Sequence, residues 1–241
     1  MQSTTVDTFM KTMFLGLLVC VAAVTAPAIA GSPATRFTDT FDIDKTDLSS
    51  TGRNRYFVLE PGYQLVLEDG QGRKAAVLTI TVLNETRMVD GVETRVVEEK
   101  ETVGGQLAEV SRNYFAISRK TGDVFYFGED VDVYKNGKVV NHEGAWLSGV
   151  NGARFGLMIP GMPLLGARYQ QEVAPKVAMD RAEIVGLSET LQTPAGRFER
   201  CLKTEETSAL EGGRAYKVYA PGVGLIFDGD LKLTKCGQAA R

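Results

Sequence analysis

A series of short β-branched and aromatic runs, separated by turn sequences, extends over residues 56–233 and constrains this chain more than any other feature. The pairs Asp90-Gly91 and Asn136-Gly137 stand between such runs, and pairs of this kind favour the positive φ angles of tight hairpins. By contrast, no stretch carries an apolar stripe of helical period over several turns. The sequence therefore predicts an all-β fold, an antiparallel meander of roughly eleven strands.

A meander of this length must protect the edges of its sheet. Unpaired edges invite pairing with other chains, and curling or closing the sheet removes them. We therefore expect a strongly curved half-barrel or a barrel, with a two-sheet sandwich as the alternative. The stretch 147–165 interrupts the pattern, because it is rich in Gly, Met and Pro and shows neither strand nor helix period. It is predicted to form one long Gly/Met/Pro loop at one mouth of the barrel.

The N-terminus has the pattern of a signal peptide. Lys11 precedes an apolar run at 13–24, and a small-x-small signature ends at Ala30, as at a signal-peptide cleavage site. The apolar run is too short for a good transmembrane anchor. We predict a signal peptide over 1–30, cleavage near Ala30, and a periplasmic or extracellular product that has no transmembrane span.

The remainder of the chain divides near residue 54. Residues 31–54 are polar and rich in Thr and Asp, so we predict an N-terminal arm there. Residues 55–241 are predicted to form a single antiparallel β domain. Cys20 raises the question of lipid attachment, but Val19 stands before it where a small residue is usual. An apolar cysteine inside a removed signal peptide is therefore the preferred interpretation.

Charge and motif content exclude several classes of function. The formal net charge is −3 and basic residues are interspersed with acidic ones, whereas nucleic-acid binding needs clustered Lys and Arg. The chain has one histidine, His142, so two-histidine metal sites are impossible and a Ser-His-Asp site would have to use it. Neither a P-loop nor a complete Gly-x-Gly-x-x-Gly motif is present. We expect no metal, no cofactor and no assembled catalytic site.

Carboxylates leave one enzymatic alternative open. A glycosidase-like hydrolase needs two carboxyl groups that converge on a cleft. Glu172, Asp180 and Glu183 could supply them, although most β proteins contain comparable sets of acidic residues. A carboxylate-dependent hydrolase is therefore kept as a further alternative.

Two cysteines remain after signal-peptide removal, Cys201 and Cys236. An exported address makes a disulfide plausible, because oxidising compartments preserve such bonds. In a simple meander, however, Cys201 begins one strand, a second strand returns, and Cys236 ends the third, so the two would lie at opposite edges about 30 Å apart. A disulfide requires Cα atoms within about 7 Å. A bridged pair and two free thiols both remain open at this point.

The apolar interruption and the strand that follows it provide the candidate ligand-binding residues. Trp and Met offer large or adaptable apolar surface, and a lid over a curved sheet would enclose an apolar pocket. The alternative is that the same segment simply fills and caps the core. The candidate ligand-binding residues are Trp146, Phe155, Met158, Met162 and Tyr169.

Several phrases together resemble a known group of sequences. They are Tyr56-Phe57 with Pro61-Gly62, and the segments 89–97, 126–130, 193–198 and 219–225. In combination they resemble a family of uncharacterised exported bacterial β-rich proteins, over about residues 56–227. The architecture is more loosely similar to the half-barrels of envelope lipoprotein carriers. This similarity implies handling of an apolar ligand, and it carries over no catalytic residue.

The sequence thus favours a non-catalytic exported protein that binds an apolar or amphiphilic ligand in a curved β sheet. Its partners would be a lipid-like molecule or an envelope protein, and not nucleic acid. The alternative from another class is a protein-interaction or scaffold module of the cell envelope. An open cavity lined by the apolar segment would favour ligand binding, whereas a filled interior with an exposed apolar patch would favour the interaction module.

Overall fold

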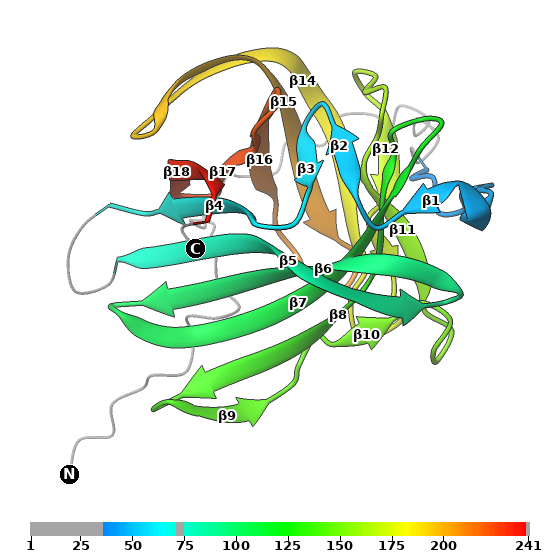
Figure 1. Cartoon of the computed structure of the whole chain (residues 1–241), viewed down its shortest axis with the longest axis horizontal. Helices are drawn as coiled ribbons and strands as arrows, with labels where there is room; N and C mark the ends of the chain where they lie inside the picture. Colours follow the sequence, from blue (N-terminus) through cyan, green and yellow to red (C-terminus); the bar gives the residue numbers. More distant parts are fainter. Residues whose placement is uncertain (1–35, 71–74, 240–241) are drawn as a thin grey trace, which may run out of the picture.

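The computed structural model describes residues 36–70 and 75–239, and antiparallel strands dominate these residues (Figure 1). The helical element among them is a short 3-10 turn, η1 (Lys45–Asp47). One large sheet curls until it nearly closes into a barrel, so the predicted all-β antiparallel fold is confirmed. Around the barrel the strands run β12 (Arg168–Gln170), β14 (Asp180–Thr193), β15 (Gly196–Ser208), β16 (Ala215–Ala220), β17 (Gly224–Asp228), β18 (Leu231–Gln238), β4 (Tyr63–Glu68), β5 (Ala76–Val89), β6 (Val92–Val103), β7 (Gln106–Ser118), β8 (Val124–Lys135), β11 (Arg154–Ile159) and β13 (Glu172–Val173).

The predicted hairpins form where the turn chemistry placed them. Asp90 and Gly91 have φ angles of 50° and 76°, and Asn136 and Gly137 have φ angles of 53° and 72°. These are the values that a two-residue hairpin with both central residues left-handed requires. The first turn joins β5 to β6, and the second joins β8 to β9 (Lys138–Asn141), a short strand whose residues are all exposed.

The two ends of the sheet meet within one stretch of chain. Strands β12 and β13 are the terminal strands of the pairing order, yet only Gln171 separates them in sequence. Residues 168–170 pair with β14, and residues 172–173 pair with β11. Between them, the backbone N–H of Gln171 donates to the backbone carbonyl of Asp180. The same extended stretch therefore has β14 on one side and β11 on the other. This arrangement removes most of the exposed edge, and it corresponds to the barrel and not to the sandwich.

The segment 147–165 is less of a loop than the sequence indicated. Its first residue ends β10 (Trp146–Leu147), which pairs with β8, and its centre forms β11, which pairs with both β8 and β13. Gly156 and Leu157 are both buried. A strand covered on both faces does not alternate in polarity, which explains why the period of two was invisible there. The irregular parts are 148–153 and 160–167.

A hairpin early in the described sequence lies between the β14–β16 side and the β5–β8 side of the curled sheet (Figure 1). It consists of β2 (Gly52–Asn54) and β3 (Phe57–Leu59), which among the described strands pair only with each other. The Asn54 amide donates to the carbonyls of Gly122 and Pro160, at 2.7 and 3.1 Å. On the other side the Gly222 amide donates to the Arg55 carbonyl at 2.7 Å. These bonds fix the hairpin within the curled sheet, because the loops that they join come from different parts of the sheet.

The described part of the predicted arm is structured. Beyond η1, the strand β1 (Leu48–Ser49) pairs with β7, and β2 begins before residue 54. The boundary expected at 54 therefore falls inside the hairpin. The predicted signal peptide, its cleavage near Ala30 and Cys20 lie outside the described residues. In the part of the chain that is described, no helix is long and apolar enough to cross a membrane.

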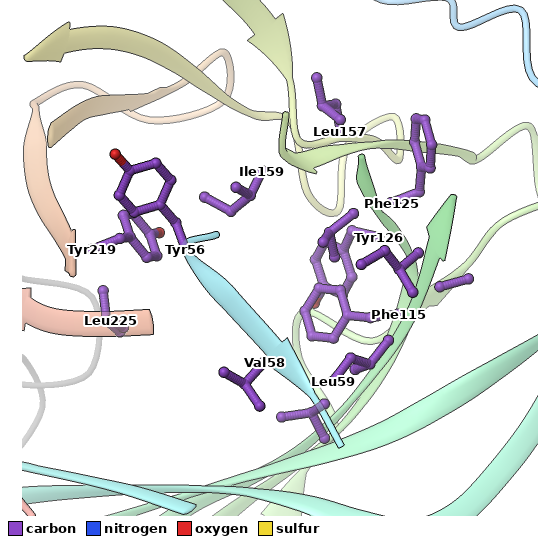
Figure 2. Packing of buried hydrophobic residues seen from close by; sticks show 14 of the residues in the cluster. Tyr56, Val58, Leu59, Phe115, Phe125, Tyr126, Leu157, Ile159, Tyr219 and Leu225 are labelled. Carbon is purple, nitrogen blue, oxygen red and sulfur yellow. The ribbon is translucent and has the colours of Figure 1, made fainter. Parts of the chain in front are cut away.

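The core lies between the hairpin and the barrel wall. Figure 2 shows Val58 and Leu59 of β3 among buried side chains of the barrel strands. Phe57 meets Phe115 edge to face at 5.1 Å between ring centroids, and Phe115 stacks on Tyr126 at 4.8 Å. Burial of each such side chain contributes about 1.5–3 kcal/mol. The hairpin is thus held by packing as well as by the hydrogen bonds at its turn.

Candidate functional site

A cavity lies inside the barrel, between the hairpin and the far end of the sheet. The space open to water centres within it is about 70 Å³, which is enough for several water molecules. Most of its wall is aliphatic or aromatic, and four polar residues line it from β6, β16 and β17. The lining consists of Phe57, Val58, Tyr63, Leu65, Ile80, Val82, Val97, Glu99, Phe115, Met158, Lys217, Tyr219, Val223, Gly224, Leu225 and Asp228.

Strand register explains why these side chains share one space. On β4, Tyr63, Leu65 and Leu67 are buried while the residues between them are partly exposed, as expected for alternate residues on opposite faces. On β6 the same alternation sends Val97 and Glu99 into the cavity. An apolar wall therefore continues directly into a charged one along single strands.

The hydroxyl of Tyr219 has no hydrogen-bond partner among the residues that the structure describes. The residue is 2% exposed, lines the cavity from β16, and is labelled among the packed side chains of Figure 2. Burial raises its pKa well above the ordinary value, and Glu206 raises it further, so the phenol is neutral. A buried polar group without a partner costs about 1–3 kcal/mol. The nearby hydroxyl of Tyr169, 3% exposed, is also unpartnered.

Lys217 is the cation of this charged wall. Its Nζ lies 3.1 Å from a carboxylate oxygen of Glu206 and 3.7 Å from one of Asp228. Lys217 and Asp228 keep 23% of their side-chain surface accessible and Glu206 keeps 12%. Burial lowers the pKa of Lys217, but Asp228 and Glu206 raise it more, and the net pKa is well above its usual value. The lysine is therefore charged and already matched by two carboxylates.

The charged groups gather at the end of the barrel away from the hairpin. Asp180 begins β14, Glu206 precedes the last two residues of β15, and Asp228 ends β17. Glu206 contributes to the raised pKa of Asp180 and of Asp228. Asp228 in turn contributes to the raised pKa of Glu99 on β6, and Asp180 contributes to that of Glu129 on β8 and Glu172 on β13. We call this set the acidic end, and it comprises Glu99, Glu101, Glu109, Glu129, Glu172, Asp180, Glu206 and Asp228.

The acidic end holds more negative charge than its cation can balance. Burial is the main cause that raises the pKa of Glu99 to about 7 and that of Glu129 to about 8. Burial followed by neighbouring carboxylates also raises the pKa of Glu101 and Glu109. Among the described residues, Lys217 is the cation that acts on Glu99. Close to neutral pH these carboxyls must retain protons or acquire a positive partner, because unpaired charge is costly in such surroundings.

The geometry does not suit a metal ion. In the ranges 36–70 and 75–239 no group of three or more His, Cys, Asp or Glu side chains could hold one. Glu172 accepts a hydrogen bond from the Asp180 backbone amide, at 2.5 Å. Glu183 instead faces Arg168, with Nε to Oε2 at 2.7 Å. The three carboxylates considered for a hydrolase are thus divided between the acidic end and a separate ion pair.

The predicted ligand-binding residues are distributed over different places. Met158 lines the barrel cavity. Phe155 stacks on Phe127 at 4.9 Å between ring centroids, in a separate aromatic cluster. Met162 is 78% exposed on the loop after β11, and Tyr169 is buried at 3%. Trp146 lines a second pocket of about 250 Å³ between β10 and the turn that follows β13.

Cys201 and Cys236 are both free, the first buried on β15 and the second exposed on β18. Strands β16 and β17 stand between these two strands, which is one strand more than the sequence predicted. His142 lies at the surface with its side chain 68% exposed, and its Nδ1 lies 2.9 Å from an Asp132 carboxylate oxygen and 2.8 Å from the Val131 carbonyl oxygen.

Sequence reasoning missed the polar part of the cavity. Glu99 lies within a run of four charged residues at 98–101, which looks solvated on both faces. Lys217 is the single charged residue of the short strand β16, and Asp228 is the single charged residue of β17. The alternation of side chains along a strand was the available signal. Lys217 and Tyr219 are two residues apart on β16 and therefore share a face of the sheet.

Comparison with known proteins adds little to this geometry. No protein-family model matches the chain, and no curated protein matches it. One solved structure that resembles it is a candidate lipoprotein from Parabacteroides distasonis, 14% identical, with a TM-score of 0.36. The match covers 77% of this chain and 100% of that one. A likeness at this level indicates neither a shared function nor a shared ligand, and the family resemblance stays a prediction.

Proposed function

We propose that this chain is an exported, non-catalytic binding protein that holds a small amphiphilic ligand inside the barrel. The observation that carries the proposal is the cavity itself, which joins an apolar wall to half-buried charged groups. Phe57, Val58 and Leu225 supply apolar surface, and Glu99 and Lys217 stand at the other end of the same space. Ligand pockets typically combine mostly apolar walls with a few polar groups that fix orientation.

The size of the cavity sets a condition on binding. Pockets for drug-sized ligands measure about 300–1,000 Å³, whereas this space is about 70 Å³. A hydrocarbon chain would therefore enter only if part of the wall moves. We assign this movement to the β2–β3 hairpin, because among the described strands it pairs only with itself while Phe57 and Val58 line the cavity. Opening would break the hydrogen bonds that join Asn54 and Arg55 to the barrel loops. In this proposal the hairpin, and not the 147–165 segment, gates the cavity.

Dye binding tests the proposal directly. The neutral apolar dye N-phenyl-1-naphthylamine should become fluorescent on mixing with the purified chain and be displaced by twelve-carbon amphiphiles. Val97→Phe fills the cavity from the rigid strand β6, where Val97 is 2% exposed, and should weaken dye binding at least tenfold. The matched control Val139→Phe changes an exposed residue of β9, 42% accessible. Equal dye binding by both variants and the parent chain would refute the proposal.

An interaction module remains the second candidate, and one observation favours it. Met162, Leu164 and Leu165 are 78%, 63% and 66% exposed on the loop between β11 and β12. Exposed apolar groups of this kind occur at protein-interaction sites. The double variant Leu164→Gln/Leu165→Gln should abolish co-purification of an envelope protein if this loop docks it. If the variant retains every partner of the parent chain, this candidate fails.

A further inference from the structure

We propose that the polar group of the bound amphiphile is a protonated amine, held between the Glu99 carboxylate and the Tyr219 hydroxyl. This inference rests on the proposed function, since it names the class of ligand for the same cavity. Glu99 reaches the cavity from β6 and Tyr219 from β16. The two groups offer acceptors from different strands, whereas the remainder of the wall offers mostly apolar surface.

The charge already present favours a cation over an anion. Lys217 is the cation of the described residues that lines the cavity, and Glu206 and Asp228 already lie 3.1 and 3.7 Å from its Nζ. Glu99 and Glu129 have no cation of their own at comparable distance among the described ion pairs. An anionic head group would meet a matched lysine surrounded by carboxylates, so it would gain little attraction and face repulsion.

The orphaned hydroxyl is an independent indication of a hydrogen-bonding ligand. Tyr219 is only 2% exposed and lines the cavity, and its hydroxyl has no hydrogen-bond partner in 36–70 or 75–239. A protonated amine can donate one hydrogen bond to its oxygen and another to Glu99. A quaternary ammonium has the same charge but no N–H, so it satisfies the carboxylate alone. The two cations are therefore expected to bind with different affinities.

An organic cation also fits the positions of the acidic groups better than a metal ion does. Of the residues that the structure describes, no three acidic, His or Cys side chains come close enough together to hold a metal. The apolar wall formed by Ile80, Val82 and Leu225 continues from the charged end. A long-chain amine matches both halves of the cavity, because its hydrocarbon body follows that wall while the nitrogen remains at Glu99.

Binding of an ammonium group should release protons from the acidic end. Glu99 has a pKa of about 7 because of burial, and a cation next to it would favour the ionised form. Binding must then strengthen as pH rises through 7, by up to tenfold per pH unit for each proton released. The titratable and charged groups that interact with Glu99 are Lys217 on β16, Asp228 on β17, Glu101 on β6, Glu109 on β7, and Glu129 and Tyr126 on β8.

Four twelve-carbon ligands separate the outcomes: dodecylamine, dodecyltrimethylammonium, dodecanol and dodecanoate. Displacement of N-phenyl-1-naphthylamine from the full chain gives the affinity of each at pH 6 and pH 8. We expect dodecylamine to bind most tightly, at least tenfold more tightly than dodecanol at pH 8. Its affinity should rise between pH 6 and pH 8, while that of dodecanol should remain within twofold.

Two glutamates of β6 provide a matched pair of variants. Glu99→Gln should weaken dodecylamine at least tenfold, remove its pH dependence and leave dodecanol unchanged. Glu98→Gln alters the neighbouring carboxylate, which faces Arg112 at 3.3 Å, and should change none of these values. Far-UV circular dichroism confirms that each variant is folded. Tyr219→Phe should reduce the preference for dodecylamine over dodecyltrimethylammonium.

The results distinguish the two proposals. If none of the four ligands binds or displaces the dye, the proposed amphiphile-binding function fails. If dodecanol or dodecanoate binds as tightly as dodecylamine, the amphiphile site stands and the amine assignment is overturned. The same conclusion follows if Glu98→Gln and Glu99→Gln weaken dodecylamine equally.

Discussion

Replacing Lys217 with methionine tests whether the acidic end is buried as strongly as its geometry indicates. Methionine keeps the length and apolar body of the side chain and removes the charge. Glu206 and Asp228 then lose the cation that lies within 4 Å of each. Removal of one partner from a buried ion pair typically destabilises a protein by about 3–5 kcal/mol. Because these side chains keep 12–23% of their surface, we expect about 3 kcal/mol at pH 8.

The loss should depend on pH. The pKa of Lys217 is raised well above 10.5 in the folded chain, so its stabilising contribution is complete below about pH 10. Between pH 5 and pH 8, any change in the destabilisation caused by Lys217→Met must therefore come from titration of the carboxyl groups. The pKa of Asp228 is already raised in the presence of the lysine, mainly by burial, and should rise further without it. Protonation at pH 5 then relieves the unpaired charge, and the destabilisation should become smaller.

Urea unfolding followed by circular dichroism at pH 8 and pH 5 measures both effects. The matched control is Lys100→Met, which removes a half-exposed lysine that lies 3.8 Å from Glu98. Exposed pairs contribute about 0–1 kcal/mol, so this control should unfold almost as the parent does. The reasoning is refuted if Lys217→Met loses less than about 1 kcal/mol at pH 8, or loses as much at pH 5.

Three further predictions follow from the structure. The pKa of Glu99 is about 7 in the folded chain, above the 4.5 of an unfolded glutamate, so this residue stabilises the fold most at low pH. The urea midpoint of the parent chain should therefore fall from pH 5 to pH 8. A midpoint that rises would contradict this. Asn54→Ala removes three side-chain hydrogen bonds at the hairpin turn, two donated to barrel loops and one accepted from the Tyr56 backbone amide. We expect a loss of about 1–2 kcal/mol and faster hydrogen exchange at 52–59 than in the barrel strands, and unchanged exchange there would argue against a mobile hairpin. Cys236 is exposed and Cys201 buried. In a chain without residues 1–30, and therefore without Cys20, alkylation without reductant should add one label to the native chain and two to the unfolded chain, whereas no label in either state would reveal a disulfide.

Sequence patterns predicted the elements whose local chemistry determines their structure. The hairpin turns at 90–91 and 136–137 were recognisable because both central residues tolerate positive φ. Strand β11 was not recognisable, because burial on both faces removes the alternation that identifies a strand. Closure of the barrel depends on Gln171 and its neighbours reaching both ends of the sheet, which is a long-range relation with no local signature.

The candidate site was harder to predict than the fold for a similar reason. Glu98 and Glu99 are neighbours in a charged run, yet one forms a surface ion pair with Arg112 and the other lines the cavity. The two side chains point to opposite faces of β6, and the direction in which the sheet curves decides which face lies inside the barrel. The apolar candidates were chosen by composition, and the structure brings Met158 into the barrel cavity while it places Phe155 in another cluster.

The most direct test of the central claim is the pKa of the Glu99 carboxyl in the folded chain. Carbon-13 NMR of labelled glutamate, assigned with Glu99→Gln, follows its titration. A buried charged wall within the barrel predicts a value near 7, and a clear decrease when dodecylamine is added. A value close to 4.5 that does not move with the amine would mean that this carboxyl is solvated, and it would contradict the account.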